Sequence, residues 1–136
     1  LQAAIGKVQL SKLDRMLAEN KKRYMVLQKN LSKEFKIRGT PSDSEASWDT
    51  LIVFEENHKR RDQFIKILHS EGFGTKNLPD AMEWHCSKFW NHALPKKQIL
   101  RGNKTHKILE TAIAIPIWLR KSITEYENLA KKLIET

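Results

Sequence analysis

The sequence predicts an α+β domain: a small, mostly antiparallel sheet of three to four strands packed by helices, with a long N-terminal helix. Three observations indicate this class. Apolar residues recur at helical spacing over the first 33 positions, two short strand-like runs follow with only turn residues between them, and the chain closes on a strand-like run followed by an amphipathic helix. At 136 residues, the chain can enclose one hydrophobic core.

The N-terminal helix is expected from position 1 to about Lys33, with a bend near Gly6 or Asn20. Its apolar positions step by three, four, seven, three and four, which places them on one face of a helix: Leu10, Leu13, Leu17, Tyr24, Leu27 and Leu31. The stripe already includes Leu1, and no capping residue precedes it. We therefore expect the chain to be part of a longer protein, and one face of this helix to contact something outside it.

Two strands are expected next. Residues 35–38 alternate between apolar and polar side chains, and residues 47–54 end in the continuous apolar run Leu51–Phe54, which predicts cover on both faces of the sheet. The connection at 39–45 consists of turn-forming residues.

The middle of the chain is expected to be helical over 57–71, with Gly72 at the position just after the helix. Residues 73–78 are expected to be a strand or extended segment. A helix could begin at Pro79 and continue to about Leu94, and Gly102 and Asn103 indicate a loop.

The C-terminal part is expected to contain a strand at 109–119, where Pro116 favours an edge position or a bulge. Thr124 and Glu127 match a capping box that would open the last helix. That helix is expected to bury an apolar stripe formed by Tyr126, Leu129, Leu133 and Ile134.

The net charge of +9 allows two interpretations. Basic side chains could neutralise nucleic-acid phosphates, or they could form a solvated surface. They are spread along the chain among acidic residues, without the aromatic interleaving of RNA-stacking motifs, so we expect no nucleic-acid partner. The longest apolar run, 112–119, is too short to span a membrane, and the single cysteine, Cys86, suits a reducing cytoplasm.

The sequence offers no self-contained catalytic or metal site. Its five glycines are scattered and form no phosphate-binding loop. His85 and Cys86 are adjacent and would point in different directions, which makes them a poor nucleophile pair. His85 and His92 are seven residues apart, a spacing that zinc sites on one helix do not favour.

The segment 75–90 is the best candidate for ligand binding, because it mixes aromatic rings with amide, ammonium and imidazole groups. We predict that five of its residues bind substrate: Thr75, Lys76, Asn77, Trp84 and His85. The alternative interpretation, strongest for Phe89 and Trp90, is an aromatic stripe that packs on the core.

Several stretches resemble one family in order and spacing. Together they are similar to the C-terminal domain of DegT/StrS-type sugar aminotransferases. The matching stretches are the opening Leu-Gln-Ala-Ala-Ile-Gly-Lys-Val-Gln-Leu with Leu13-Asp14, the segment Ser-Glu-Gly-Phe-Gly-Thr at 70–75, and Ala-Ile-Pro-Ile at 114–117 followed by Ser-Ile-Thr-Glu at 122–125. In many members a His-Tyr or His-Phe pair follows the Thr. Here Lys76-Asn77-Leu78 stands in its place, and His85 is the residue that could match a later family His.

This resemblance implies that residues 1–136 are the small C-terminal domain of a fold-type I enzyme that uses pyridoxal phosphate (PLP). The Schiff-base lysine, the carboxylate on the pyridinium nitrogen and the phosphate cup would then lie in a large domain upstream, so we assign no catalytic or cofactor-binding residue here and expect this chain alone to be inactive. The resemblance also implies a cytoplasmic homodimer in which the segment after Thr75 closes over the substrate.

The stretch Asn-Leu-Pro-Asp-Ala-Met-Glu-Trp-His at 77–85 resembles one branch in particular. That branch aminates an eight-carbon keto-sugar acid to 8-amino-3,8-dideoxy-manno-octulosonate, with glutamate as the donor, for surface polysaccharide or lipopolysaccharide synthesis. The alternative hypothesis is a stand-alone basic α+β module that binds an acidic partner or nucleic acid.

Overall fold

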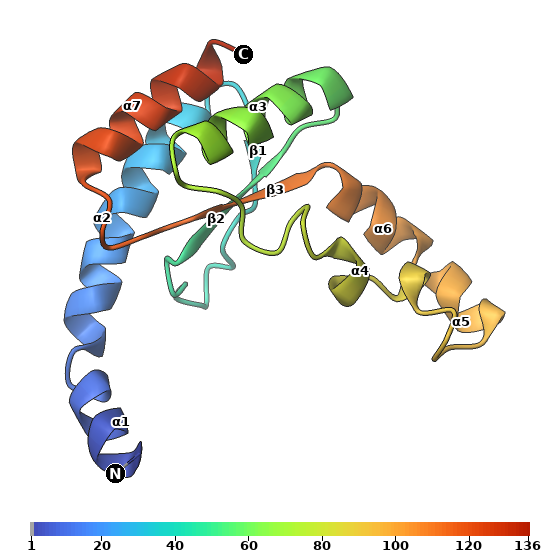
Figure 1. Cartoon of the computed structure of the whole chain (residues 1–136), viewed down its shortest axis with the longest axis horizontal. Helices are drawn as coiled ribbons and strands as arrows, with labels where there is room; N and C mark the ends of the chain where they lie inside the picture. The colour runs from blue at the N-terminus through green and yellow to red at the C-terminus, as the bar shows by residue number, and fades with distance from the viewer. Residues whose placement is uncertain (1) are drawn as a thin grey trace.

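A computed structural model describes residues 2–136 and shows a sheet packed by helices on one face, with a helical arm at the side (Figure 1). Within these residues the sheet has three antiparallel strands in the order β1 (Lys36–Ile37), β2 (Thr50–Phe54) and β3 (Ala112–Pro116). The α+β class with a small antiparallel sheet is confirmed. No helix in the described part of the chain is both long and apolar enough to cross a membrane.

The register of β2 and β3 gives the sheet two different faces. Leu51 pairs with Ile115 and Val53 with Ile113, and these four side chains are fully buried against the helices. The alternate residues point to the opposite face, where Ile52 and its neighbours form a smaller cluster with Leu78, Met82 and Leu109. Cover on both faces of β2 was predicted, and the second face is the thinner one.

The N-terminal helix is broken at a place that the sequence did not predict. It consists of α1 (Gln2–Leu10) and α2 (Leu13–Leu31), and the helix continues through both Gly6 and Asn20. The Ser11 hydroxyl donates to the carbonyl of Val8 at 2.8 Å, a local bond that competes with the helical ladder. Leu1 lies outside the described residues.

The apolar stripe of this helix pair is buried only at its C-terminal end. Leu27 and Leu31 are fully buried in the main core, whereas Ile5, Val8 and Leu10 are 55%, 54% and 69% exposed. In Figure 1, α1 extends well beyond the sheet. All side chains described in α1, residues 3–10, are exposed, so this chain does not cover the apolar residues there. The expected contact with something outside the chain stays a prediction.

Helix α3 (His58–Ser70) ends as the sequence predicted. Asn57 caps its start by accepting bonds from the N–H groups of Lys59 and Arg60. At its end, Gly72 takes a positive φ of 70°. The N–H of Phe73 donates to the carbonyl of Leu68 at 2.9 Å, and the N–H of Gly72 donates to the carbonyl of His69 at 3.0 Å. These two bonds form a Schellman motif, which satisfies the last carbonyls of the helix.

A helical arm occupies residues 82–110, where the sequence predicted a single helix, a loop and the start of a strand. It contains α4 (Met82–His85), a 3₁₀ turn η1 (Ser87–Phe89), α5 (Lys96–Arg101) and α6 (Asn103–Glu110). Helix α4 begins three residues after the expected start at Pro79, and the region around Gly102 is a junction between two helices rather than a loop. Gly102 is buried, and a Cβ there would lie 2.5 Å from the Ser87 hydroxyl, so close packing within the arm determines this junction.

The last strand is shorter than predicted, and the last helix begins earlier, with a different cap. β3 begins at Ala112 because the preceding residues belong to α6, and Pro116 ends it at the sheet edge, as expected. Helix α7 (Ile123–Ile134) opens with a capping box formed by Ser122 and Glu125, so the box predicted at Thr124 and Glu127 is wrong. Tyr126, Leu129 and Leu133 are buried as predicted, and Ile134 is half-buried.

Candidate functional site

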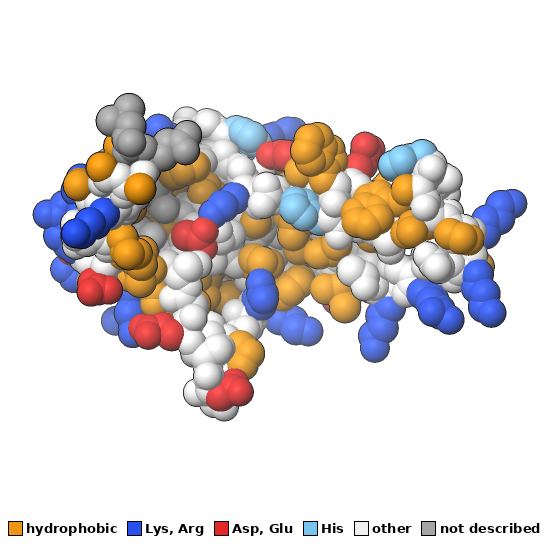
Figure 2. Space-filling view, turned by 90° about the horizontal axis from the view of Figure 1, so that it is seen from below, with side chains coloured by type: hydrophobic (Ala, Val, Ile, Leu, Met, Phe, Trp, Pro, Cys, Tyr) orange, Lys and Arg blue, Asp and Glu red, His pale blue; other side chains and the backbone are white. Residues whose placement is uncertain are grey.

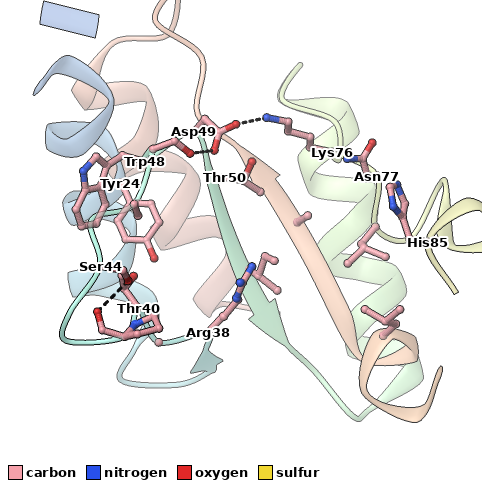
Figure 3. A pocket seen from close by; sticks show the side chains of 18 of the residues that line it. Tyr24, Arg38, Thr40, Ser44, Trp48, Asp49, Thr50, Lys76, Asn77 and His85 are labelled. Atoms are coloured by element: carbon pink, nitrogen blue, oxygen red, sulfur yellow. Dashed lines mark hydrogen bonds and ion pairs between the residues drawn. The ribbon is translucent and has the colours of Figure 1, made fainter. Parts of the chain in front are cut away.

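A cavity of about 780 Å³ lies on the sheet face opposite the main helices. The turn-rich connection from Arg38 to Thr50 forms one wall, residues 76–78 form the other, and the apolar side chains of β2 and β3 form the floor (Figure 3). Tyr24 reaches it from α2, His85 from α4, and Thr105 and Leu109 from α6. The cavity therefore collects side chains from almost every part of the chain.

An ion pair connects the two walls. The Lys76 ammonium contacts Asp49 Oδ2, and the Ser47 hydroxyl donates to Asp49 Oδ1 at 2.7 Å (Figure 3). The bond from Lys76, with help from Ser47, holds the pKa of Asp49 below its ordinary value, although partial burial acts in the other direction. Asp49 is therefore ionised at neutral pH and neutralises the charge of Lys76.

Trp48 and Tyr24 form the aromatic part of the site. Their ring centroids are 5.0 Å apart at an interplanar angle of 72°, and the Lys21 ammonium lies 5.0 Å from the centroid of the Trp48 ring. Trp48 has a positive φ of 58°, which is unusual for a bulky residue and costs conformational energy. This backbone geometry precedes β2 and allows the ring to pack on α2 while Asp49 turns toward Lys76.

The opposite wall is a tight segment hydrogen-bonded to the edge of β3. The N–H of Lys76 bonds the carbonyl of Ala114 at 2.9 Å, and the N–H of Ala114 bonds the carbonyl of Leu78 at 3.1 Å. Asn77 lies between them with a positive φ of 69°, a conformation that Asn tolerates better than most residues. The segment predicted as a strand or extended piece thus joins the sheet edge through one residue, Ala114, and does not form a fourth strand.

The structure brings three of the five predicted substrate-binding residues together. Lys76, Asn77 and His85 all line the cavity. Thr75 lies beside them, and its hydroxyl donates to Asp80. Trp84 is 80% exposed and does not line the cavity, so for this residue the structure gives no shared site with the other four. The substrate-binding roles of all five stay predictions.

The aromatic residues with a competing core interpretation belong to the arm. The indole N–H of Trp90 donates to the carbonyl of Glu83 at 2.9 Å, and Phe89 packs on His106 at 5.4 Å between ring centroids. Both are half-buried, neither lines the cavity, and neither joins the main core or the smaller cluster on the other sheet face. They therefore pack within the arm rather than on the core as the alternative interpretation expected.

Sequence reasoning missed the contribution of Tyr24, Arg38, Trp48 and Asp49. Tyr24 was assigned to the helical stripe, and the other three belong to segments assigned only as strand and turn. A possible signal was the pair Trp48-Asp49, an aromatic and an acidic residue next to a turn-rich stretch, which is the same mixture that marked residues 75–90.

Within the described residues, the groups that a PLP or metal site would need are not gathered at the cavity. Lys76 is the lysine that lines the cavity, and Asp49 contacts its ammonium group. Gly72 and Gly74 lie close together after α3, but the five glycines match no phosphate-binding motif in the sequence. Within residues 2–136, no group of three or more His, Cys, Asp or Glu side chains could hold a metal ion.

The structure is therefore a small α+β domain with a cavity whose walls combine polar and aromatic side chains. The DegT/DnrJ/EryC1/StrS aminotransferase family matches residues 1–133, nearly the whole chain, and the chain belongs to this family. A comparison with curated protein sequences gives no significant match.

The chain is similar in fold to part of several longer solved structures. They include 3-amino-5-hydroxybenzoic acid synthase (TM-score 0.71, 16% identity, 95% of this chain and 36% of that one) and the aminotransferase TlmJ from Streptoalloteichus hindustanus (TM-score 0.69, 17% identity, 96% and 34%). A protein from Streptococcus pneumoniae described as a sugar aminotransferase, in its PMP form, matches with a TM-score of 0.67 at 16% identity, over 98% and 35% of the two chains. The chain spans about a third of the length of each.

Proposed function

We propose that this chain is the small C-terminal domain of a PLP-dependent sugar aminotransferase and that its cavity is the substrate-facing wall of the active site. The observation that carries the proposal is the family match over residues 1–133, combined with a cavity whose walls mix hydrogen-bonding side chains with aromatic rings. Such a mixture suits a sugar, because hydroxyl groups need polar partners and the C–H faces of the ring pack on aromatic surfaces.

In this proposal a separate large domain, outside the described residues, holds the cofactor. The similar solved structures are long enough to contain such a domain, because this chain covers only 36% and 34% of two of them. PLP supplies the electron sink for amino transfer. The residues of this chain bind and orient the keto-sugar: Asn77 and His85 offer hydrogen bonds to its hydroxyls, and the wall formed by Trp48 excludes water from that side.

The finer proposal is that the substrate is an eight-carbon keto-sugar acid, aminated with glutamate as the donor during surface polysaccharide or lipopolysaccharide synthesis. It is supported by the similarity of residues 77–85 to that branch and by the surplus of positive charge in the cavity. The parent would be a cytoplasmic homodimer, and the exposed apolar face of α1 would pack on its own large domain.

The stand-alone basic module has less support. In Figure 2, Asp and Glu lie among the Lys and Arg side chains only on the left part of the face. Along the lower right, Lys and Arg side chains are separated by hydrophobic and other residues and do not form one continuous patch. An interface for nucleic acid would need such a patch to neutralise successive phosphates.

The test uses the full-length enzyme and separates the two half-reactions. Asn77→Ala and His85→Ala should each lower kcat/KM for the keto-sugar by about five- to one-hundredfold, because a hydrogen bond to a bound polar group is lost. The half-reaction with the amino donor should change much less. Lys66→Ala is the control, because Lys66 is an exposed residue of α3 on the opposite side of the sheet from the cavity. Equal loss in both half-reactions, or a lower melting temperature, would assign these residues to structure instead.

A further inference from the structure

Arg38 is a cation in the cavity that the proposed sugar contacts do not use. It follows β1, where its backbone N–H bonds the carbonyl of Ile52 at 2.9 Å, and its side chain lines the cavity. In Figure 3 the side chain extends over β2 into the cavity. Within residues 2–136, its guanidinium makes no hydrogen bond or ion pair, in contrast to Lys76 on the opposite wall.

Tyr24 brings a second unused polar group to the same space. Its side chain is only 5% exposed, yet within the described part of the chain its hydroxyl has no hydrogen-bond partner, and Figure 3 shows it directed into the cavity. The hydroxyl oxygen is not among the fully buried polar atoms that lack a partner, so it is accessible from the cavity. It can therefore donate a hydrogen bond to an acceptor that enters the cavity.

The protonation state of Tyr24 suits this role. Burial raises the pKa of the phenol above its ordinary value, and the charge of Arg38 opposes that shift only in part. The hydroxyl is therefore protonated at neutral pH and can donate to an oxygen of the ligand. Tyr24 and Arg38 both line the cavity, so the phenol and the guanidinium face the same space.

The charges that line the cavity do not cancel. Asp49 neutralises Lys76, which leaves the guanidinium of Arg38 as a surplus of one positive charge among the formally charged lining residues. Guanidinium is permanently charged, and its planar set of donors matches the two oxygens of a carboxylate or phosphate. An adjacent O–H donor adds a third bond to the same group.

We propose that Arg38 and Tyr24 form an oxyanion subsite that holds a carboxylate or phosphate group of the ligand bound in this cavity. The subsite deepens the proposed function, because it requires the bound sugar to carry an acidic group. The identification of the ligand as the substrate rests on the proposed function. The sugar hydroxyls then reach Asn77 and His85 across the cavity, and the acidic group sets the direction in which the sugar lies.

The experiment measures binding of simple probes to the full-length protein by tryptophan fluorescence. The probes are D-glucose, D-glucuronate, which differs by one carboxylate, and D-glucose 1-phosphate, which adds a phosphate. At least one anionic probe should bind about tenfold or more tightly than glucose. Arg38→Ala should remove that preference, with a loss of about ten- to one-hundredfold for the anion and little change for glucose.

Three further variants make the result specific. Tyr24→Phe keeps the ring against Trp48 and loses only the hydroxyl, so it should weaken anion binding by about two- to tenfold. Arg38→Lys keeps the positive charge but loses the planar set of guanidinium donors. Its affinity for the anionic probe should lie between those of Arg38→Ala and the native protein. Lys66→Ala removes one positive charge from the opposite side of the sheet and should leave all three affinities unchanged.

Each outcome decides a point. Tighter binding of glucuronate identifies a carboxylate, and tighter binding of glucose 1-phosphate identifies a phosphate, provided that Arg38→Ala abolishes the preference. Equal binding of all three probes, or a preference that survives Arg38→Ala, overturns the subsite. Failure of the full-length protein to transfer an amino group to any keto-sugar would overturn the proposed function while leaving an Arg38-dependent anion preference intact.

Discussion

At the scale of single residues, the buried hydroxyl of Tyr126 joins the end of β3 to α7. It accepts the N–H of Trp118 at 2.6 Å and donates to the carbonyl of Pro116 at 3.3 Å. The ring itself is fully buried and packs edge-on against Phe73. One side chain therefore satisfies two backbone groups at the place where the chain leaves the sheet.

Tyr126→Phe should lower the free energy of unfolding by about 1–3 kcal/mol, because both backbone groups lose their partner while the ring packing stays. Urea denaturation followed by circular dichroism measures the change. Phe73→Leu, which disturbs the same contact without touching the hydrogen bonds, serves as a comparison. An unchanged midpoint for Tyr126→Phe would show that the hydroxyl is dispensable.

The same hydroxyl makes stability sensitive to high pH. Burial raises the pKa of Tyr126 above its ordinary value of 10.0, and Tyr24 shifts in the same direction. A raised pKa in the folded state means that this stabilisation is complete below about pH 10 and is lost as the pH rises through the folded-state value. The native protein should therefore lose stability above pH 10 more steeply than Tyr126→Phe, as measured by the melting temperature across pH 8–11.

Lys76 controls the ionisation of Asp49. Lys76→Met should raise the Asp49 pKa toward its ordinary value, and Ser47→Ala, which removes a weaker partner, should raise it less. Because folding lowers the Asp49 pKa, the ionised Asp49 stabilises the fold at pH values above its pKa in the unfolded state. This contribution is lost as the pH falls through the folded-state pKa. Both side chains are more than a third exposed (39% and 47%), so solvent screening keeps this contribution below about 1 kcal/mol. NMR titration of the Asp49 carboxyl carbon measures the shift, and an unchanged value would contradict the assignment.

At the scale of elements, the start of α7 shows how a local pattern can be ambiguous. Ser122-Ile-Thr-Glu125 and Thr124-Glu-Tyr-Glu127 both fit the spacing of a capping box. The structure uses the first, because Ser122 has the extended backbone of a cap whereas Thr124 lies inside the helix.

Ser122→Ala should therefore destabilise the protein by about 1 kcal/mol, whereas Thr124→Ala should change stability by less than about 0.5 kcal/mol. The two substitutions remove a hydroxyl from positions two residues apart, so each controls for the other. Thermal unfolding of both variants gives the answer, and a larger loss for Thr124→Ala would mean that the helix begins two residues later.

At the scale of the whole molecule, α1 exposes apolar residues that one small domain does not cover. Ile5, Val8 and Leu10 face solvent on a helix that extends past the sheet (Figure 1). Exposed apolar patches of this kind usually mark association surfaces. Under the proposed function, this surface contacts the large domain.

The chain produced by itself should self-associate through α1. Sedimentation velocity should show dimers or larger species at high concentration, and Ile5→Lys with Val8→Lys should shift the protein toward monomer because it places charges on the apolar face. Met25→Lys, at an exposed position in α2, is the control. A strict monomer at all concentrations would contradict the prediction.

The chain by itself should also neither hold PLP nor transfer amino groups. Its described residues offer no free cavity lysine and no phosphate-binding loop, so PLP should give only scattered surface adducts. Borohydride trapping followed by peptide mapping measures this. A stoichiometric adduct at one lysine would disprove the prediction.

The sequence by itself determined the features that depend on local periodicity. Helical spacing predicted α2 and α7 with their buried residues, the apolar run of β2 predicted cover on both faces, and Gly72 predicted the end of α3. These features can be predicted from the sequence because residues close together in the chain determine them. The mixture of polar and aromatic residue types, rather than periodicity, indicated Lys76, Asn77 and His85, which lie within ten residues of one another and line the cavity. Their substrate-binding role stays a prediction.

Only the tertiary structure decided between local alternatives and brought distant segments together. The helix break at Ser11 and the cap at Ser122 involve hydrogen bonds between near neighbours that compete with equally plausible local patterns, and the junction at Gly102 depends on close packing against Ser87. The other half of the site shows this most clearly. Tyr24 and Arg38 belong to a helix and a strand end far from Lys76 in sequence, and they share a cavity with it because the antiparallel pairing of the sheet brings these segments to one face.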